Sequence, residues 1–334
     1  MSDAPPKKGD VVLKVEGLKT GFNIEGKMAW AVRGVSFEVY AGEILGIVGE
    51  SGSGKSVTSL SLMRLIPDPP GRIAEGKVMF KGRDLLQLSF PEMRKIRGKD
   101  IAMIFQEPMT SLNPVFTVGM QVMESLKFHE DLDDDAAKAR AVEMLTLVGI
   151  PDASKRLDAY PHQFSGGMRQ RVMIAMALIC KPAVLIADEP TTALDVTIQA
   201  QILELMKDLQ RKRGDASILL ITHDLAVVAE TCHRVIVMYG GQIQETAEIK
   251  DLFDNPTHPY TIGLLGSIPR PELKGKPLTA IPGNVPSIMN FPEGCRFATR
   301  CTKVMDHCWK VEPPLIEIRP GHQVRCHLFT EESP

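Results

Sequence analysis

Two short segments of this 334-residue chain carry residue types suited to binding phosphate. The first reads Gly-Glu-Ser-Gly-Ser-Gly-Lys-Ser and matches the P-loop pattern G-x-x-x-x-G-K-[ST]. Glycines allow such a loop to turn its backbone N–H groups toward phosphate, and the helix that follows directs its positive end to the same place. Lys55 supplies a charge for the outer phosphates, and the Ser56 hydroxyl suits Mg²⁺. The predicted nucleotide-binding residues here are Gly49, Glu50, Ser51, Gly52, Ser53, Gly54, Lys55 and Ser56.

The second segment is the turn Ser165-Gly166-Gly167, which precedes the apolar stretch Val172–Ile179. A hydroxyl and two accessible backbone N–H groups at the start of a predicted helix form a second anion site. One nucleotide cannot easily use both segments of the same chain, because two subdomains separate them. We therefore expect this turn to close on the nucleotide of a partner chain.

Four polar residues follow short apolar runs of the kind that form buried parallel strands. Asp188 is placed to reach Mg²⁺, and Glu189 to orient a water molecule or take its proton. Gln106 offers an amide to Mg²⁺ or water, and His223 a hydrogen bond to the outermost phosphate. Taken singly, each has a structural alternative, such as a surface acidic pair or a packing histidine. The preceding runs are 101–105, 183–187 and 218–222.

The elements that must hold these residues have an α/β pattern. A helix is predicted over 57–66, ended by Pro67, Pro69 and Pro70, and the section 101–180 is mostly helical in pattern. Gly240-Gly241 indicates a late hairpin. The other predicted strands are 11–15, 35–39, 44–48, 183–187, 218–222 and 235–239.

Composition excludes several classes of protein. Hydrophobic residues make up 44% of the chain, which is enough for a core, and the formal net charge of −2 gives no basic field for nucleic acid. Six cysteines are too few for a secreted disulfide scaffold, and residues 1–10 lack an apolar signal core. No stretch approaches the roughly 18 apolar residues of a membrane span. We expect a cytosolic protein whose membrane role, if any, comes through partners.

These motifs, in this order, resemble those of the ATP-binding cassette (ABC) family, the match covering about residues 11–250. The resemblance implies ATP and Mg²⁺ as ligands, a head-to-tail ATPase dimer, Glu189 as general base and Asp195 in contact with the opposing subunit. It places Gln170 in the signature that meets the partner's ATP. Phe164 and Met168 depart from the commonest signature. The matching segments are 49–56, Gln106, 164–170, 184–189, 192–195 and His223.

The family fold implies an α/β P-loop domain over 1–250, with a RecA-like core, an antiparallel β subdomain and a helical subdomain at about 107–180. An aromatic residue upstream of the P-loop usually stacks on adenine in this family. Phe22 is the candidate and Trp30 the runner-up, and core packing is the alternative for both.

A narrower resemblance links residues 160–163, 258–261 and the tail to the ATPase subunits of dipeptide and oligopeptide permeases, most closely the dipeptide group. It implies an importer with two transmembrane permease subunits, a second related ATPase and an extracytoplasmic peptide-binding protein. The ATPase would lie at the cytoplasmic face of the inner membrane. Nickel and glutathione importers share these features, so those solutes remain alternatives.

The composition changes near residue 251, where prolines multiply and four of the six cysteines follow. We expect a small C-terminal domain over 251–334. The spacing of Cys295, Cys301, Cys308 and Cys326 fits neither the C-x-x-C zinc pattern nor the bacterial ferredoxin pattern. Resemblance to the permease group implies a [4Fe-4S] cluster at these four residues, with Zn²⁺ as the alternative metal. The simplest alternative is that the four thiols bind no metal.

Two other functions compete with transport. A soluble ABC ATPase acting on ribosomes or DNA usually carries two cassettes or a long coiled coil, and neither is present. A P-loop kinase or GTPase is contradicted by the Ser-Gly-Gly signature and by the absence of an Asn-Lys-x-Asp guanine motif.

Overall fold

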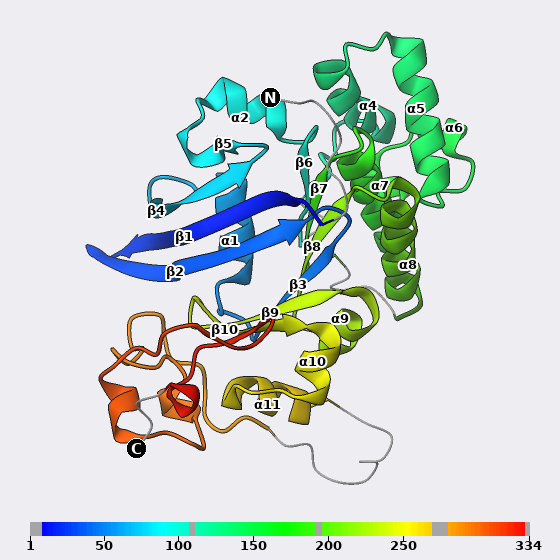
Figure 1. Ribbon diagram of the computed structural model, residues 1–334. Coiled ribbons are helices and arrows are strands. Elements are labelled where there is room, and N and C mark those ends of the chain that lie inside the picture. Colours follow the sequence, from blue (N-terminus) through cyan, green and yellow to red (C-terminus); the bar gives the residue numbers. More distant parts are fainter. Residues whose placement is uncertain (1–8, 107–110, 191–195, 269–279, 331–334) are drawn as a thin grey trace. The chain divides into compact units, whose positions relative to one another are not determined.

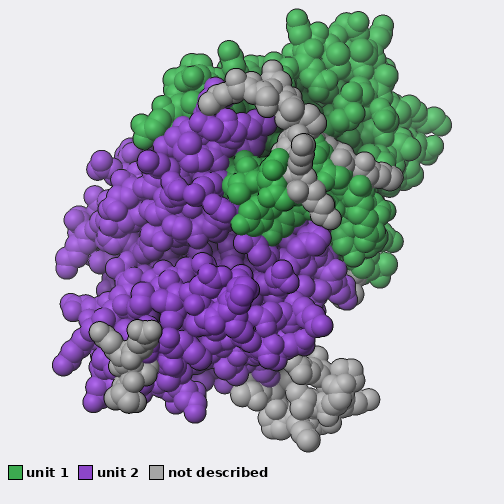
Figure 2. Space-filling model, viewed as in Figure 1, with its two compact units in different colours: residues 1–13, 39–43, 87–220 green, residues 14–38, 44–86, 221–334 purple. Residues whose placement is uncertain are grey.

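The computed structural model describes residues 9–106, 111–190, 196–268 and 280–330. The chain forms two compact units (Figure 2). Unit 1 comprises Met1–Leu13, Val39–Glu43 and Gln87–Leu220. Unit 2 comprises Lys14–Glu38, Ile44–Leu86 and Ile221–Pro334.

Unit 2 contains an antiparallel sheet with the strand order β2-β1-β4-β5 (Figure 1). The predicted short strands at 11–15 and 35–39 belong to two much longer strands, and they lie at the ends far from the turn that joins the two. A two-residue turn joins them, in which Glu25 and Gly26 both have positive φ angles of 50° and 81°. Such a turn matches the twist of the flanking strands, although it lacks the usual Asn-Gly signal. The strands are β1 (Val11–Ile24), β2 (Lys27–Tyr40), β4 (Gly71–Phe80) and β5 (Arg83–Asp84).

Strand β3 (Ile44–Val48) lies inside a second sheet, and all of its residues are buried. It runs parallel to β9 (Arg234–Tyr239), and β9 pairs antiparallel with β10 (Gln242–Glu248), which confirms the predicted hairpin. Two strands that sequence analysis did not predict continue the sheet from the tail. They are β12 (His322–Val324) beside β10, and β11 (Ile316–Arg319) beside β12.

Helix α1 (Lys55–Leu62) follows the P-loop and is shorter than predicted. It ends in a Schellman motif, in which Arg64 has φ 50° and the Leu65 N–H donates to the Leu60 carbonyl at 2.8 Å. The local C-terminal cap thus stops the helix before the prolines do. The other helices of unit 2 are α9 (Leu225–Thr231), α10 (Ile249–Asp254) and α11 (Pro259–Gly266), with 3₁₀ turns at Ala298–Arg300, Asp306–Trp309 and His327–Phe329.

Unit 1 combines short parallel strands with the predicted helical section. β6 (Ile101–Ile104) pairs parallel with β7 (Val184–Asp188), and β8 (Ser217–Thr222) is the next strand beyond β7. Several helices begin at side-chain caps, for example Thr117 on α4 and Asp133 on α5. No helix in the described ranges combines the length and apolar character needed to cross a membrane. The helices are α2 (Phe90–Ile96), α4 (Val118–His129), α5 (Asp134–Leu147), α6 (Ala153–Arg156), α7 (Gly166–Leu178) and α8 (Val196–Arg213), with 3₁₀ turns at Pro161–Gln163 and, next to the unit boundary, Leu85–Gln87.

Candidate functional site

The P-loop of unit 2 connects β3 to α1 in the order that sequence analysis predicts. Two of its glycines are required by their surroundings. A Cβ on Gly49 would lie 2.2 Å from the Met238 carbonyl oxygen, and one on Gly54 would lie 2.5 Å from that of Ala31. Gly54 also has φ 99°, which favours glycine. The loop is therefore pressed against neighbouring backbone and leaves no room for side chains at these points.

The Lys55 ammonium group is held inside this loop. It donates to the carbonyl oxygens of Gly49 at 2.7 Å and Glu50 at 3.0 Å, and the residue is only 5% exposed. Buried charge is stable only when it is paired or hydrogen-bonded, and here the loop's own carbonyl groups contribute to that role. The conformation of residues 49–50 thus sets the position of the ammonium group.

Glu50 has two contacts that sequence analysis missed. Its carboxylate accepts two hydrogen bonds from the Arg300 guanidinium, at 2.6 and 3.1 Å, and its backbone N–H donates to the Tyr260 hydroxyl at 2.9 Å. Tyr260 belongs to the segment used for the permease resemblance, but nothing in the sequence linked it to the P-loop. Arg300 gave no signal beyond its place beside Cys301.

In unit 1, the structure brings Gln106 and Glu189 together. The Gln106 side-chain amide donates to the Glu189 carboxylate at 3.0 Å, across 83 positions of sequence. Glu189 follows β7 with φ 46°, a left-handed conformation that is uncommon for a residue with a side chain. Asp188 ends β7 and is 3% exposed. Strand β7 thus places two carboxylates in succession at its end, as predicted, and the second sits on strained backbone.

The Ser-Gly-Gly turn forms the N-terminus of α7. Ser165 is exposed, and its hydroxyl caps the helix by accepting from the Met168 N–H at 3.3 Å. A Cβ on Gly166 would meet nothing within 4 Å, so the approach to the first helical turn is open. Gln170, in contrast, is 1% exposed, and its amide donates to the Pro190 carbonyl oxygen. Gln170 therefore lies inside unit 1 rather than on the surface that the turn presents.

The other residues predicted for the nucleotide site lie in unit 2, except Asp195. His223 is exposed in unit 2, after the last residue of β8 and before the helix that Asp224 caps. Phe22 is half-buried, and a Cβ on Gly71 would lie 2.9 Å from its ring, whereas the Lys19 ammonium lies 4.5 Å from the Trp30 ring centroid. The predicted Asp195, with the rest of segment 192–195, lies outside the described residues.

The four tail cysteines gather in one part of unit 2. Burial raises the pKa of Cys295 to about 12 and that of Cys326 to about 11, and the other tail cysteines add to the rise at Cys295. The Cys295 N–H donates to the Cys308 carbonyl oxygen at 2.7 Å, whereas Cys301 is only half-buried. Yet the described residues contain no group of three or more Cys, His, Asp or Glu arranged to hold a metal ion. The thiols are neighbours but do not form a ligand set.

A buried polar network ties the tail to β10. His322 contacts Glu245 at 2.7 Å and also Asp251, and Glu245 accepts from the backbone N–H of Thr257 and His258 at 2.8 and 2.9 Å. Burial alone lowers the pKa of His322, but the two carboxylates outweigh it and raise the pKa above its ordinary value. Burial lowers the pKa of His258 to about 4, so this residue is neutral and its ring nitrogen caps α11 at the Tyr260 N–H.

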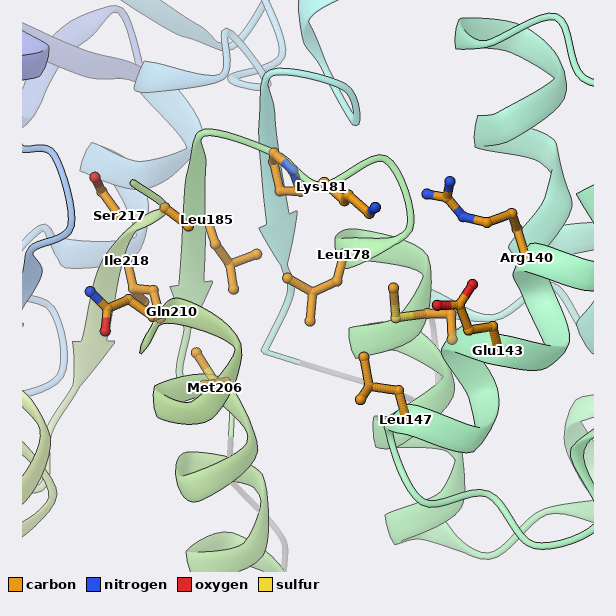
Figure 3. Close-up of a pocket in the computed structure, with 13 residues that line it drawn as sticks. Arg140, Glu143, Leu147, Leu178, Lys181, Leu185, Met206, Gln210, Ser217 and Ile218 are labelled. Atoms are coloured by element: carbon orange, nitrogen blue, oxygen red, sulfur yellow. The ribbon is translucent and has the colours of Figure 1, made fainter. Parts of the chain in front are cut away.

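A separate pocket of about 200 Å³ lies among helices and strands of unit 1 (Figure 3). Its walls are apolar, with Leu178, Leu185 and Met206 among the lining residues, while Arg140 and Glu143 are the charged side chains on the α5 side. None of the predicted nucleotide residues that the structure describes lines it. Because the lining offers no phosphate-binding loop and no strand-end carboxylate, this pocket is not the nucleotide site.

Comparison with protein families identifies two regions. The model described as "ABC transporter" matches residues 32–192, which include the P-loop, Gln106, the Ser-Gly-Gly turn and the end of β7. The model described as "Oligopeptide/dipeptide transporter, C-terminal region" matches residues 244–308. The second region contains Tyr260, Arg300 and three of the four tail cysteines.

Similar proteins extend over nearly the whole chain. The dipeptide transport ATP-binding protein DppD of Bacillus subtilis (strain 168) is 56% identical over 322 residues, covering 96% of this chain and 96% of that protein. The oligopeptide transport ATP-binding protein OppD of the same organism is 55% identical over 324 residues, covering 97% and 90%.

Among solved structures, the dimeric post-hydrolysis state of the ATP-binding cassette MJ0796 bound to ADP and Pi has a TM-score of 0.64 and 28% identity. The likeness covers 71% of this chain and 98% of that one. It confirms the predicted α/β P-loop fold. With these motifs in place on that fold, and with relatives this similar along their full length, the chain belongs to the ATP-binding proteins of ABC transporters.

Proposed function

We propose that this chain is the ATP-hydrolysing subunit of an importer that takes up dipeptides or oligopeptides across the cytoplasmic membrane. The observation that carries the proposal is the joint presence of an ABC region and a peptide-transporter C-terminal region in one chain. Two of its relatives are named as dipeptide and oligopeptide transport proteins. ATP binding would close a pair of ATPase subunits, and hydrolysis would reopen it.

Each predicted residue takes a role suited to its chemistry. The N–H groups of 49–56 and the Lys55 ammonium would bind the phosphates, while Ser56 and Asp188 offer the hard oxygen ligands that Mg²⁺ prefers. Bound Mg²⁺ would neutralise phosphate charge. Glu189 would accept the proton of the attacking water and His223 would donate to the terminal phosphate. The amide of Gln106, which contacts Glu189, would couple the presence of the nucleotide to the conformation of the helical section.

The exposed turn Ser165-Gly166-Gly167 would bind the ATP of a second, related ATPase subunit, and Asp195 would contact that subunit. The open space beside Gly166 supports the assignment of this turn to the partner's ATP, because backbone N–H groups at a helix start attract anions. Phe22 would stack on adenine, with Trp30 as the alternative.

The transmembrane permease subunits would dock on a groove of about 700 Å³ beside α4. Three large apolar side chains in it are exposed, Phe116 at 45%, Met120 at 54% and Phe128 at 47%, and Arg94 and Arg97 also line it. Such a groove suits the apolar face of a short helix, which here would be a cytoplasmic helix of the permease. The subunit would thus lie peripherally at the cytoplasmic face of the inner membrane, with an extracytoplasmic peptide-binding protein delivering the solute.

Uptake by a deletion strain tests both the solute and the groove. Restoring the wild-type gene should restore uptake of labelled di- or tripeptides. Met120→Glu should reduce that uptake at least about tenfold, because a charge in the groove costs a few kcal/mol on docking. The purified variant should still bind ATP like the wild type.

Restored uptake of nickel or glutathione in place of peptide would contradict peptide as the solute. Val115→Glu gives a matched control, because Val115 is 70% exposed and is not among the groove residues. Equal loss in both variants would contradict the groove as the docking site.

We propose further that residues 251–334 form a small C-terminal domain, which the separate family match at residues 244–308 supports, and that Cys295, Cys301, Cys308 and Cys326 ligate a [4Fe-4S] cluster. Thiolates are the ligands that such clusters use, and the four thiols lie in one part of unit 2. Ligation would require them to move closer together, because the described residues show no three of them arranged to hold a metal ion. The cluster would crosslink the tail, as metal sites do in other small domains.

Anaerobic purification tests this proposal. About four iron and four sulfide per chain are expected, and Cys326→Ser should lose most of the iron. Cys180→Ser is the control, because Cys180 is a buried thiol just after α7 in unit 1, and the iron content of this variant should match that of the wild type. A measured content of one zinc per chain would contradict the cluster and support Zn²⁺ as the metal. Metal-free protein that is fully folded would contradict a metal site altogether.

A further inference from the structure

One acidic residue of the P-loop is held by groups from the C-terminal part of the chain. The Arg300 guanidinium makes a two-point contact with the Glu50 carboxylate, with Nη1 at 2.6 Å from Oε2 and Nη2 at 3.1 Å from Oε1. The two residues are 250 positions apart, and both lie in unit 2. Paired guanidinium–carboxylate contacts of this kind fix orientation as well as distance.

Arg300 is itself rigidly placed. Its side chain is 4% exposed, its Nε donates to the Pro282 carbonyl oxygen at 3.0 Å, and its guanidinium lies 5.8 Å from the Tyr239 ring centroid. Burial alone would lower the pKa of Arg300, but Glu50 and Tyr239 outweigh it and raise the pKa above its ordinary value. Removing Glu50 would leave the Arg300 charge with little access to water, which is strongly unfavourable, whereas the Glu50 side chain is 31% exposed and would lose its orienting contact if Arg300 were removed.

Tyr260 supplies the second contact. It is fully buried, and its hydroxyl accepts from the Glu50 N–H at 2.9 Å. Its ring packs against Tyr239 and Phe297, with centroids 4.7 and 5.3 Å away. Phe297 lies between Cys295 and Arg300 in sequence, so one aromatic cluster joins the cysteine-bearing segment to the P-loop.

Fixing Glu50 also fixes the group that meets phosphate. The carbonyl oxygens of Gly49 and Glu50 are hydrogen-bond partners of the Lys55 ammonium, at 2.7 and 3.0 Å. A shift of Glu50 would therefore move both the loop backbone and the lysine. Neither Arg300 nor Tyr260 has any other contact that would place it in the chemistry of hydrolysis among the described residues.

We propose that Arg300 and Tyr260 are positioning residues for ATP binding, and that the cysteine-bearing segment 295–301 thereby sets the nucleotide affinity of the P-loop. This inference rests on ATP binding at the P-loop. It assigns to the C-terminal region a direct part in the ATPase, separate from any metal that its thiols bind.

The test compares ATP affinity with turnover in the intact ATPase. Arg300→Gln should raise the Kd for a fluorescent ATP analogue, and the KM for MgATP, at least about tenfold, because a charge-assisted contact is lost from a buried site. The value of kcat should stay within about twofold, since the base and the metal ligands are untouched. Tyr260→Phe removes one hydroxyl from an otherwise unchanged ring and should raise the KM about threefold.

Two further variants separate positioning from simple destabilisation. Combining Glu50→Gln with Arg300→Gln should raise the KM no more than Arg300→Gln alone, because both changes break the same contact. Arg325→Gln removes a half-buried arginine of the C-terminal region, which donates to the Ile243 and Pro313 carbonyl oxygens and lies 3.6 Å from the Glu312 carboxylate. It should lower the melting temperature while leaving the KM unchanged.

Several results would overturn the proposal. They are an unchanged KM in folded Arg300→Gln, additive effects in the double variant, or an equal rise in Arg325→Gln. Lack of ATP binding by the wild type would instead refute the proposed function itself, so the two failures are distinguishable.

Discussion

Replacing Glu189 with Gln is expected to lower the rate of ATP hydrolysis by about 100-fold or more while leaving ATP affinity within about twofold. The amide has the same shape as the carboxylate and can still accept the hydrogen bond that Gln106 donates at 3.0 Å. What it cannot do is accept a proton from water. The loss would therefore fall on turnover rather than on binding.

The measurement is steady-state phosphate release together with ATP binding, followed by size-exclusion chromatography with the partner ATPase. The variant should accumulate as an ATP-bound dimer, because closure no longer leads to hydrolysis. Glu204→Gln is the matched control. Glu204 is an exposed glutamate on α8 of the same unit that pairs with Lys207 at 2.9 Å, and its loss should leave turnover unchanged. Unimpaired turnover in Glu189→Gln would remove Glu189 from the role of base.

Replacing Ser165 with Arg is expected to block hydrolysis at the partner's P-loop by about 100-fold, with this chain's own ATP binding intact. Ser165 is exposed at the start of α7, and a Cβ on Gly166 would meet nothing within 4 Å, so the helix N-terminus is open at that residue. A long arginine side chain would occupy the space that an approaching phosphate needs. Loss of the helix cap itself costs only about 1 kcal/mol, too little to unfold the unit.

The assay pairs this variant with a partner ATPase and measures hydrolysis by the pair and ATP binding by each subunit. Asp133→Arg is the matched control, because Asp133 caps α5 in the same unit by accepting from the Ala136 N–H at 2.8 Å. It removes a cap and adds the same cation at a helix with no assigned nucleotide role, so the pair should hydrolyse ATP normally. If Ser165→Arg instead abolished this chain's own binding, the arrangement in trans would be wrong.

Sequence predicted best what depends on neighbouring residues. The P-loop glycines, the cap at Ser165 and the carboxylates at the end of β7 were all anticipated, because backbone turns and helix starts are decided within a few positions. The long β1–β2 hairpin was underestimated, because its Glu25-Gly26 turn lacks the common signal. The tail strands were missed for a different reason. Strands β11 and β12 have only four and three residues, too few for a pattern of alternating hydrophobicity.

The sequence by itself indicated an ATP-binding protein and predicted which residues would bind the nucleotide, because those motifs are short and their geometry is local. Only the tertiary structure decided which distant groups support them. It paired Gln106 with Glu189, turned Gln170 into the interior of unit 1, and brought Tyr260 and Arg300 onto Glu50 from 210 and 250 positions away. Contacts at such separations follow from strand order and packing, which hydrophobic periodicity and residue spacing do not reveal.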